Sequence, residues 1–374
     1  MRTAMALLVS LALAGCVPAA EDDGEPAGGA AEAALAEEKA EPAAEPGAPA
    51  GEKAPADARP KLPEGDNGIA AKYPGDAGIG KDGKVIFAEG FESESPDALK
   101  GDWNGVKNRQ IMTYVDDVPK GSAGKKSLLM TFVGGKGSGA HLYKSFKQGH
   151  EKVHLRFYTK IDRECFPIHH FVHMGGYNPP TPWPQGGAGI RPDGAKRFST
   201  AVEPHGKAWR WDYYTYWMEM GGSPPKGQTW GNSFIRDKAP KVRKGEWECL
   251  EIMLKLNKPE EHDGEQAIWV NGKLVSHLGK GFPKGKWIFD KWELDKGGYS
   301  VRWSDEKKGR VERQVPEGGE PFEGFRWRRS AQLKLNYLWI LLYITKAPEG
   351  HVSKVSFDDI VLAKEYIGPI KSKE

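Results

Sequence analysis

Apolar and polar side chains alternate with a period of two along several segments of the chain, as expected of strands with one buried face. The clearest segments are 152–162, 248–256 and 337–344. In the last of these, leucine and isoleucine occupy every second position, while Trp339 and Tyr343 face the other way. The same reasoning predicts further strands at 85–91, 127–133, 141–146, 169–173, 198–203, 209–217, 266–271 and 354–362.

No long stretch has a convincing 3.6-residue apolar period, and clusters of Gly, Pro and Asn separate the predicted strands. The pair Asn271-Gly272 is typical of a two-residue hairpin turn. About 315 residues follow position 59, enough for one large sandwich or two small domains. The pattern therefore predicts an all-β fold, a two-sheet jelly-roll sandwich.

The N-terminal segment has the pattern of an export signal. Arg2 precedes an apolar run at 4–14, which is too short for a bilayer that needs about 20 helical residues. The tetrapeptide Leu-Ala-Gly-Cys at 13–16 resembles the lipobox of bacterial lipoproteins. This resemblance implies cleavage before Cys16 and a lipid on that cysteine, and an ordinary signal peptide with an incidental cysteine is the alternative.

The lipobox divides the chain into a signal peptide at 1–15, a lipidated cysteine with a linker at 16–60, and a folded domain at 61–374. Val17 stands where some Gram-negative lipoproteins carry a retention aspartate. The resemblance therefore implies delivery to the outer membrane or cell surface, with membrane attachment through the lipid alone. The linker is rich in Ala, Glu, Pro and Gly without aromatic residues, which predicts a disordered tether.

Charge divides along the chain. Residues 17–59 carry a net charge of −8, which leaves +10 on the region from Pro60 onward. A basic exported domain favours a polyanionic partner, such as an acidic polysaccharide or an anionic envelope polymer, and the export signal argues against nucleic acid. A dispersed, solvated charge without a partner is the alternative.

Several segments resemble concanavalin A-like jelly-roll domains. The sequence at 87–92 (Phe-Ala-Glu-Gly-Phe-Glu) and that at 355–362 are similar to the first and last strands of such domains, and 256–273 is similar to one of their hairpins. The order of His173-Met174-Gly175-Gly176, a Gly-rich loop and the strand at 198–203 resembles alginate and glucuronan lyases. The resemblance implies a polysaccharide lyase, although 175–180 and 342–345 depart from that pattern.

Cleavage of a uronate polymer by β-elimination needs a cation or amide to neutralise the carboxylate and a base to remove the C5 proton. The candidate catalytic residues come from the histidine strand, the strand after it and the aromatic strand: His170, His173, Arg197, Tyr214 and Tyr216. Strict alternation places His169 and His173 on one face and His170 on the other. Which of these faces lines the substrate groove stays open.

Candidate substrate-binding residues are basic or aromatic. One set lies on the strand predicted beside the histidine strand: His154, Arg156, Tyr158 and Lys160. A second set lies in Pro- and Gly-rich loops, where rings can stack on sugars and arginine can pair with carboxylates: Trp183, Arg191 and Trp230. The alternatives are a solvated sheet face and tryptophans that plug the ends of the sandwich.

Cys165 and Cys249 belong to an exported chain, so a disulfide between them is the expectation. The histidines lack a carboxylate at metal-ligand spacing and diverge along a strand, so no metal centre is predicted. Analogy with some jelly rolls implies a structural calcium near Glu92 and Asp358, which could equally be a strand-end turn residue. No other cofactor is expected, and the chain is predicted to be a monomer.

Two classes of hydrolase lack support in the sequence. No Gly-x-Ser-x-Gly segment occurs, and Trp217-Met218-Glu219-Met220 offers one carboxylate where a retaining glycosidase needs two. The sequence therefore predicts a surface lipoprotein that binds an extracellular anionic polysaccharide and, as a lyase, cleaves it by β-elimination. A non-catalytic carbohydrate-binding, envelope or adhesion module is the alternative.

Overall fold

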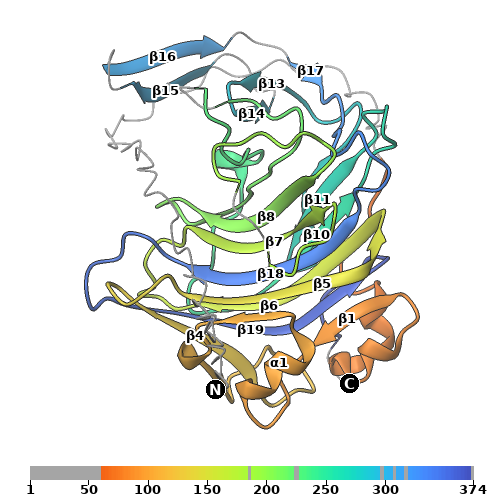
Figure 1. Ribbon diagram of the computed structural model, residues 1–374, viewed down its shortest axis with the longest axis vertical. Coiled ribbons are helices and arrows are strands. Elements are labelled where there is room, and N and C mark those ends of the chain that lie inside the picture. Colours follow the sequence, from red (N-terminus) through yellow and green to blue (C-terminus); the bar gives the residue numbers. More distant parts are fainter. Residues whose placement is uncertain are drawn as a thin grey trace, which may run out of the picture. The chain divides into compact units, whose positions relative to one another are not determined.

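Two antiparallel sheets form the body of the domain (Figure 1). The computed structural model describes residues 60–371 apart from 184–186, 223–226, 295–298, 306–308 and 316–318, and the side chains of 295–318 are not described. The described residues belong to one unit of the chain, Gly47–Glu374. The lipobox cysteine, the signal peptide and the linker lie outside the described residues.

The larger sheet has eight strands. Its order is β12 (Lys273–Leu278), β11 (Glu265–Val270), β10 (Trp247–Lys255), β6 (Lys152–Ile161), β19 (Val352–Ala363), β4 (Ser127–Val133) and β3 (Met112–Val115), with β1 (Val85–Glu89) also paired to β19. The first and last strands of the domain therefore lie side by side, as a jelly roll requires.

The second sheet has six strands. Its order is β2 (Gly105–Lys107), β5 (Ala140–His150), β18 (Leu335–Tyr343), β7 (His170–Tyr177), β8 (Arg197–His205) and β9 (Arg210–Tyr213). Figure 1 shows β5, β18, β7 and β8 running side by side. This sheet carries the histidine and aromatic strands and so positions the candidate site.

Smaller elements complete the described part of the domain. Two small sheets lie at the top of Figure 1: β13 (Lys284–Ile288) with β14 (Lys291–Leu294) and β17 (Glu320–Pro321), and β15 (Tyr299–Asp305) with β16 (Gly309–Val315). The helices are single turns: α1 (Leu99–Asp102), η1 (Ile69–Lys72), η2 (Pro74–Asp76), η3 (Ile79–Lys81), η4 (Pro96–Ala98), η5 (Arg109–Ile111) and η6 (Arg236–Lys238). No helix among the described residues is long and apolar enough to span a membrane.

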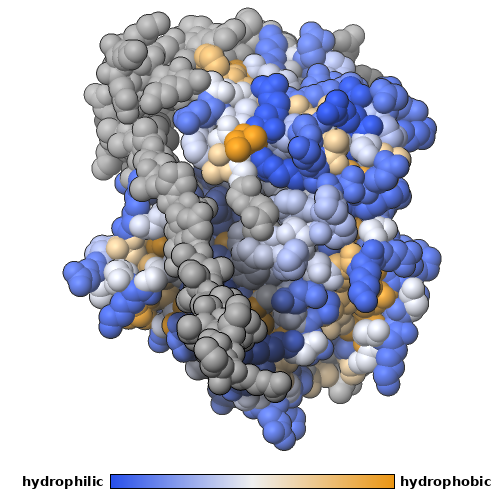
Figure 2. Space-filling view, in the orientation of Figure 1, coloured by the Kyte–Doolittle hydropathy of each residue, from blue (hydrophilic) through white to orange (hydrophobic). Residues whose placement is uncertain are grey.

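Alternating apolar side chains of the two sheets share one core. Phe157 and Phe357 of the larger sheet contact Phe171 of the smaller one, with ring centroids 6.3 and 5.0 Å apart. Leu155 and Ile340 belong to the same buried cluster. The face in Figure 2 is mostly hydrophilic, with hydrophobic residues in small, separate spots. The predicted all-β, two-sheet sandwich is confirmed.

The predicted hairpin at Asn271-Gly272 joins β11 to β12. Both residues have positive φ, 51° and 77°, as a turn of this kind requires. The asparagine side chain also accepts a hydrogen bond from the backbone amide of Cys249, at 2.9 Å, which fastens the turn to the neighbouring strand.

The prediction that strand β6 lies beside the histidine strand is wrong, because β6 belongs to the larger sheet. Its outward side chains are covered by the segments that precede β1 and follow β19. Arg156 is fully buried in an ion pair with Asp76, and His154 lies 2.9 Å from Glu251 Oε1. The Tyr158 hydroxyl accepts a hydrogen bond from the Ile370 amide at 2.9 Å.

Lys160, the fourth member of that set, forms an ion pair with Asp117 at 2.6 Å. All four side chains belong to the larger sheet, away from the histidines, and each has a structural partner. The physical reason is that a second layer of chain covers a sheet face that the alternation alone leaves open to solvent.

The predicted disulfide is absent, because Cys165 and Cys249 are both free and buried. Cys165 belongs to the core between the sheets, whereas Cys249 packs with Tyr158 on the opposite face of the larger sheet. Burial raises the pKa of each thiol to about 12, so neither forms a thiolate readily.

The carboxyl groups of Asp358 and Asp359 are buried together in β19, and each Oδ2 lacks a hydrogen-bond partner among the described residues. Burial and the neighbouring Asp359 raise the pKa of Asp358 to about 9. The Glu92 carboxylate turns instead to the amides of Lys125 and Lys126, at 2.7 and 2.9 Å. In the described part of the chain no three carboxylates here converge on one point, so the donor set does not support the calcium expected by analogy.

This pair predicts a pH-dependent stability. Between 3.8, where an unfolded aspartate titrates, and about pH 9 the folded Asp358 holds a proton that the unfolded chain has released. Its favourable contribution is complete below 3.8 and is lost as the pH rises through the folded pKa. We expect the free energy of unfolding to fall across this interval, and Asp358→Asn to flatten the slope and gain on the order of a few kcal/mol at the alkaline end.

Urea unfolding followed by tryptophan fluorescence at several pH values measures this slope. The control is Asp97→Asn, because Asp97 is exposed and should leave the slope as in the wild type. An Asp358→Asn slope equal to that of the wild type would contradict the prediction.

Candidate functional site

An irregularity in β7 decides which histidines share a face. Phe171 and Val172 are consecutive, yet both belong to the core between the sheets. The pairing of β18 with β7 shifts register at the same place, between Ile340 and Tyr343. The break in alternation turns His170 to the outer face of the sheet, where His173 also lies. The prediction of opposite faces for these two histidines is therefore wrong.

Glu203 of β8 joins the two imidazoles. Its Oε1 lies 2.9 Å from His170 Nδ1 and 3.2 Å from His173 Nε2. Glu203 and His173 are buried, at 4% and 7% exposure, whereas the His170 side chain is 24% exposed. Burial alone would raise the pKa of Glu203, but His170 and His173 hold it at about 2. Glu203 is therefore an anion that is hydrogen-bonded to His170 and lies close to the His173 ring.

Arg197, at the start of β8, and two tyrosines beyond that strand continue this face. The hydroxyls of Tyr214 and Tyr216 lie 3.5 Å apart. The Arg197 guanidinium lies over the Tyr216 ring, 5.7 Å from its centroid, and the Tyr214 ring centroid lies 5.2 Å from that of His170. Burial raises the pKa of both phenols, that of Tyr214 well above its ordinary value. Both phenols are therefore protonated at neutral pH.

The Arg197 side chain is held by the loop between β7 and β8. Its Nη2 donates hydrogen bonds to the carbonyls of Gly187 and Ile190, at 3.2 and 2.7 Å. A Cβ at position 187 would lie 2.3 Å from the guanidinium carbon, so a larger residue there would displace the guanidinium from this position. The loop thus orients a cation, and no hydrogen bond of its other nitrogens is found among the described residues.

Aromatic rings extend the face towards β5. Trp339 packs against His173 and His141, with centroids 5.5 and 5.6 Å apart. Trp183, from the loop after β7, contacts Tyr143 at 5.8 Å and Trp339 at 6.1 Å. Burial lowers the pKa of His141 to about 3, so this ring is neutral. The result is a largely uncharged aromatic region beside the ionised groups.

We name this surface the histidine face. It is the outer face of the six-stranded sheet together with the Trp183 ring from the loop after β7. Its members are His141, Tyr143, His170, His173, Trp183, Arg197, Glu203, Tyr214, Tyr216, Trp339 and Tyr343. All five residues predicted as catalytic lie on it, as does Trp183. Of the other predicted binding residues, Arg191 is exposed in the β7–β8 loop, and Trp230 is half-buried near Gly189 of that loop.

Sequence reasoning missed five members of the histidine face: His141, Tyr143, Glu203, Trp339 and Tyr343. Alternation from Arg197 along β8 passes through positions 199 and 201 to Glu203, so that signal was present in the sequence. Trp339 and Tyr343 were recognised as facing away from the core without being assigned to a site. Their partnership with the histidines depends on strand order, which periodicity does not give.

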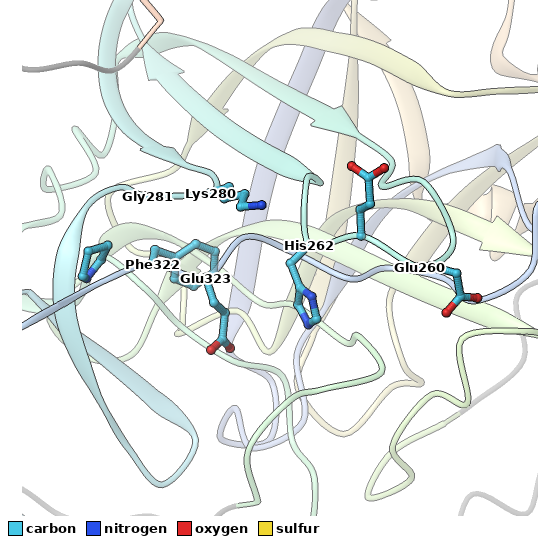
Figure 3. A pocket seen from close by; sticks show the side chains of 8 residues that line it. Glu260, His262, Lys280, Gly281, Phe322 and Glu323 are labelled. Atoms are coloured by element: carbon cyan, nitrogen blue, oxygen red, sulfur yellow. The ribbon is translucent and has the colours of Figure 1, made fainter.

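A separate pocket lies outside the histidine face (Figure 3). It is lined by Glu260, Glu261, His262, Lys280, Gly281, Pro321, Phe322 and Glu323. His262 Nε2 lies 2.7 Å from Glu219 Oε2. The pKa of Glu323 is raised, mainly by burial and to a lesser extent by the negative charge of Glu219. The lining carries more carboxylates than cations, which disfavours a polyanionic ligand there.

No protein-family profile and no curated protein matches the chain. Among solved structures it is similar to the marine PL-14 alginate lyase from Aplysia kurodai, at 12% identity, over 75% of this chain and 99% of that one, with a TM-score of 0.46. It is also similar to a mutant of the alginate lyase Aly36B in complex with alginate tetrasaccharide, at 14% identity over 76% and 96%, with a TM-score of 0.44.

A third similar structure is the endo-β-1,4-glucuronan lyase from the fungus Trichoderma reesei, at 14% identity over 75% and 95%, with a TM-score of 0.40. Likenesses at this level concern the arrangement of strands. The function is therefore argued from the side chains of the histidine face.

Proposed function

We propose that the protein is a polysaccharide lyase that cleaves an extracellular uronate polymer by β-elimination on the histidine face. The observation that carries this proposal is the convergence of a cation, two phenols and a pair of imidazoles on one sheet face, next to aromatic rings. These are the groups that the reaction needs: an electrophile for the carboxylate, groups that move a proton, and a platform for sugar rings.

Arg197 is the group that neutralises the substrate carboxylate. Its guanidinium is half-buried and anchored through Nη2 alone among the described contacts, so Nη1 keeps its hydrogens for a substrate carboxylate. Pairing withdraws charge from the carboxylate and makes the adjacent C5 proton more acidic. The net charge of +10 from Pro60 onward favours the approach of such a polymer.

The tyrosine pair moves the proton. With both phenols protonated at rest, one hydroxyl accepts the C5 proton as it passes its own to the second hydroxyl, which protonates the leaving glycosidic oxygen. The C5–H and C4–O bonds break, the C4–C5 double bond forms, and both tyrosines end the step protonated. This relay fits the raised pKa of both phenols, since neither has to be ionised beforehand.

The aromatic region supports binding of neighbouring sugar units. Trp183 comes from a loop and Trp339 from β18, and the two rings meet with centroids 6.1 Å apart and an interplanar angle of 67°. Rings in this position offer apolar faces to the C–H faces of a sugar. We therefore assign Trp183 and Trp339 to polymer binding and Arg197, Tyr214 and Tyr216 to the reaction.

The sequence features of the N-terminus support a surface location for this activity. The lipobox at 13–16 and the acidic linker would hold the basic domain near the membrane through a lipid on Cys16. A tethered domain fits capture of a long polymer outside the cell better than work on a small diffusing metabolite.

The test is an incubation of the full-length protein with alginate, glucuronan and pectate, each in a separate reaction, with neutral dextran as the control polymer. The expected result is a rise in the ultraviolet absorbance of the unsaturated uronate product with one or more of the acidic polymers and none with dextran. If the protein is retained on an affinity gel of the polymer but forms no product, the proposed lyase activity would be rejected in favour of a binding module. Absence of both would contradict any polysaccharide function.

A further inference from the structure

We propose that His170, His173 and Glu203 form a binding site for a divalent transition-metal ion of the Zn²⁺ class. These are the three side chains, among the described residues, whose ligand atoms all lie within 4.8 Å of one another. The site combines two imidazole nitrogens with one carboxylate oxygen, a donor set that suits zinc and related ions. Its role in catalysis rests on the proposed function, whereas metal binding does not.

The distances fit an ion after a small adjustment. Ligand atoms around a tetrahedral zinc lie about 3.3 Å apart, because each bond is about 2.0 Å long. The two nitrogens lie 2.9 and 3.2 Å from Glu203 Oε1. All three donor atoms lie within 4.8 Å of one another, so opening the two contacts to the carboxylate by a few tenths of an ångström would leave room for a cation between them.

The buried nitrogen of His173 points to a missing partner. His173 is 7% exposed, and its Nε2 has no hydrogen-bond partner among the described residues, although Glu203 Oε1 lies only 3.2 Å away. An unpaired buried polar nitrogen is costly, and native structures rarely leave one. A metal ion between this nitrogen and the carboxylate would give the nitrogen a partner.

The surroundings hold the ligands and leave one side open. The Tyr343 ring stacks on His170 at 5.8 Å with an interplanar angle of 9°, and Trp339 packs against His173. The exposed edge of His170 marks the open side, where a fourth ligand from solution can bind. One carboxylate cancels half of the charge of a divalent ion, so the open position favours an anion such as a uronate carboxylate.

Other histidine–carboxylate pairs lack this convergence. His262 with Glu219, His277 with Glu265 and His154 with Glu251 each bring one imidazole to one carboxylate. The histidine face gains its third donor because the irregularity at Phe171 and Val172 turns both His170 and His173 to Glu203. The convergence of three donor atoms therefore depends on the backbone irregularity in β7.

The test is a titration of the untagged full-length protein, stripped with a chelator, with Zn²⁺ by calorimetry and with Co²⁺ by visible absorbance. We expect one ion of each per chain, with the absorption of a low-symmetry cobalt site of imidazole and carboxylate ligands. His173→Gln should weaken binding by more than the about 10–100-fold that loss of an outer-shell partner costs. The matched control, His262→Gln, removes a histidine from a two-residue pair and should bind as the wild type does.

Circular dichroism shows whether His173→Gln is folded, and Glu203→Gln, which keeps the side-chain shape, is the second variant. The proposal is overturned if the wild type binds neither ion stoichiometrically, or if His173→Gln and His262→Gln bind alike. The two proposals fail separately. Stoichiometric metal with no lyase product would keep the metal site and reject the lyase, whereas lyase activity in a protein that binds no ion would do the reverse.

Discussion

Arg156→Met should destabilise the protein by about 3–5 kcal/mol, the usual cost of leaving the partner of a buried ion pair without its counter-charge. Arg156 is fully buried, pairs with Asp76 and donates to the Asp359 carbonyl at 2.9 Å. Without it, Asp76 and the carboxyl groups of Asp358 and Asp359 lose the cation nearest to them. Chemical unfolding of the full-length protein measures the loss.

The matched control is Lys160→Met on the same strand. Lys160 pairs with Asp117 in a partly exposed contact, with side chains 31% and 45% exposed, so its loss should cost at most about 1 kcal/mol. Arg156 and Lys160 were predicted from the sequence to bind substrate, so the same variants also test that prediction. A stable Arg156→Met that no longer binds polymer would show that the structural account of Arg156 is wrong.

Tyr216→Phe should lower turnover by about 10²–10⁴-fold, the range typical of a lost proton-transfer group. The change removes one hydroxyl of the relay and leaves the ring beneath Arg197 in place. Substrate affinity should therefore change little, and the effect should fall on kcat. Steady-state kinetics on the polymer that gives product measures both constants.

The control for this prediction is Tyr158→Phe, which removes a buried hydroxyl from the opposite sheet. It should leave turnover within a factor of a few while costing some stability. Equal turnover in Tyr216→Phe and the wild type would remove the tyrosine pair from the mechanism, and a selective loss in Tyr158→Phe would move the site to the larger sheet.

Periodicity predicted strands well where a strand has one buried and one polar face. The segment 127–133 is β4 with the same bounds, and the segment 248–256 differs from β10 by one residue at each end. In these two strands the two-residue alternation holds at every position, so it correctly predicts which side chains point into the core. The strands between 284 and 321 were not predicted. In β15 the alternation of Tyr299, Val301 and Trp303 with polar residues was present in the sequence and was overlooked, whereas β13, β14 and β17 are short.

The candidate site was predicted in part, and its errors have local causes. His170 and Glu203 meet because the alternation breaks at Phe171 and Val172, and a sequence pattern that assumes strict alternation puts His170 on the wrong face. Arg156 looked like an exposed cation because the segment that carries Asp76 covers it from far away in the sequence. Long-range cover and strand order are set by tertiary packing, which local periodicity does not encode.

The central claim is that the histidine face cleaves a uronate polymer through its carboxylate. The most direct measurement compares the wild type and Arg197→Ala on one acidic polymer and on the same polymer with its carboxylates chemically reduced to alcohols, following the absorbance of the unsaturated product. The account predicts product from the wild type on the acidic polymer alone, and a loss of about 10²–10³-fold or more in Arg197→Ala. Equal product from wild type and variant, or none from the wild type on any acidic polymer, would contradict it.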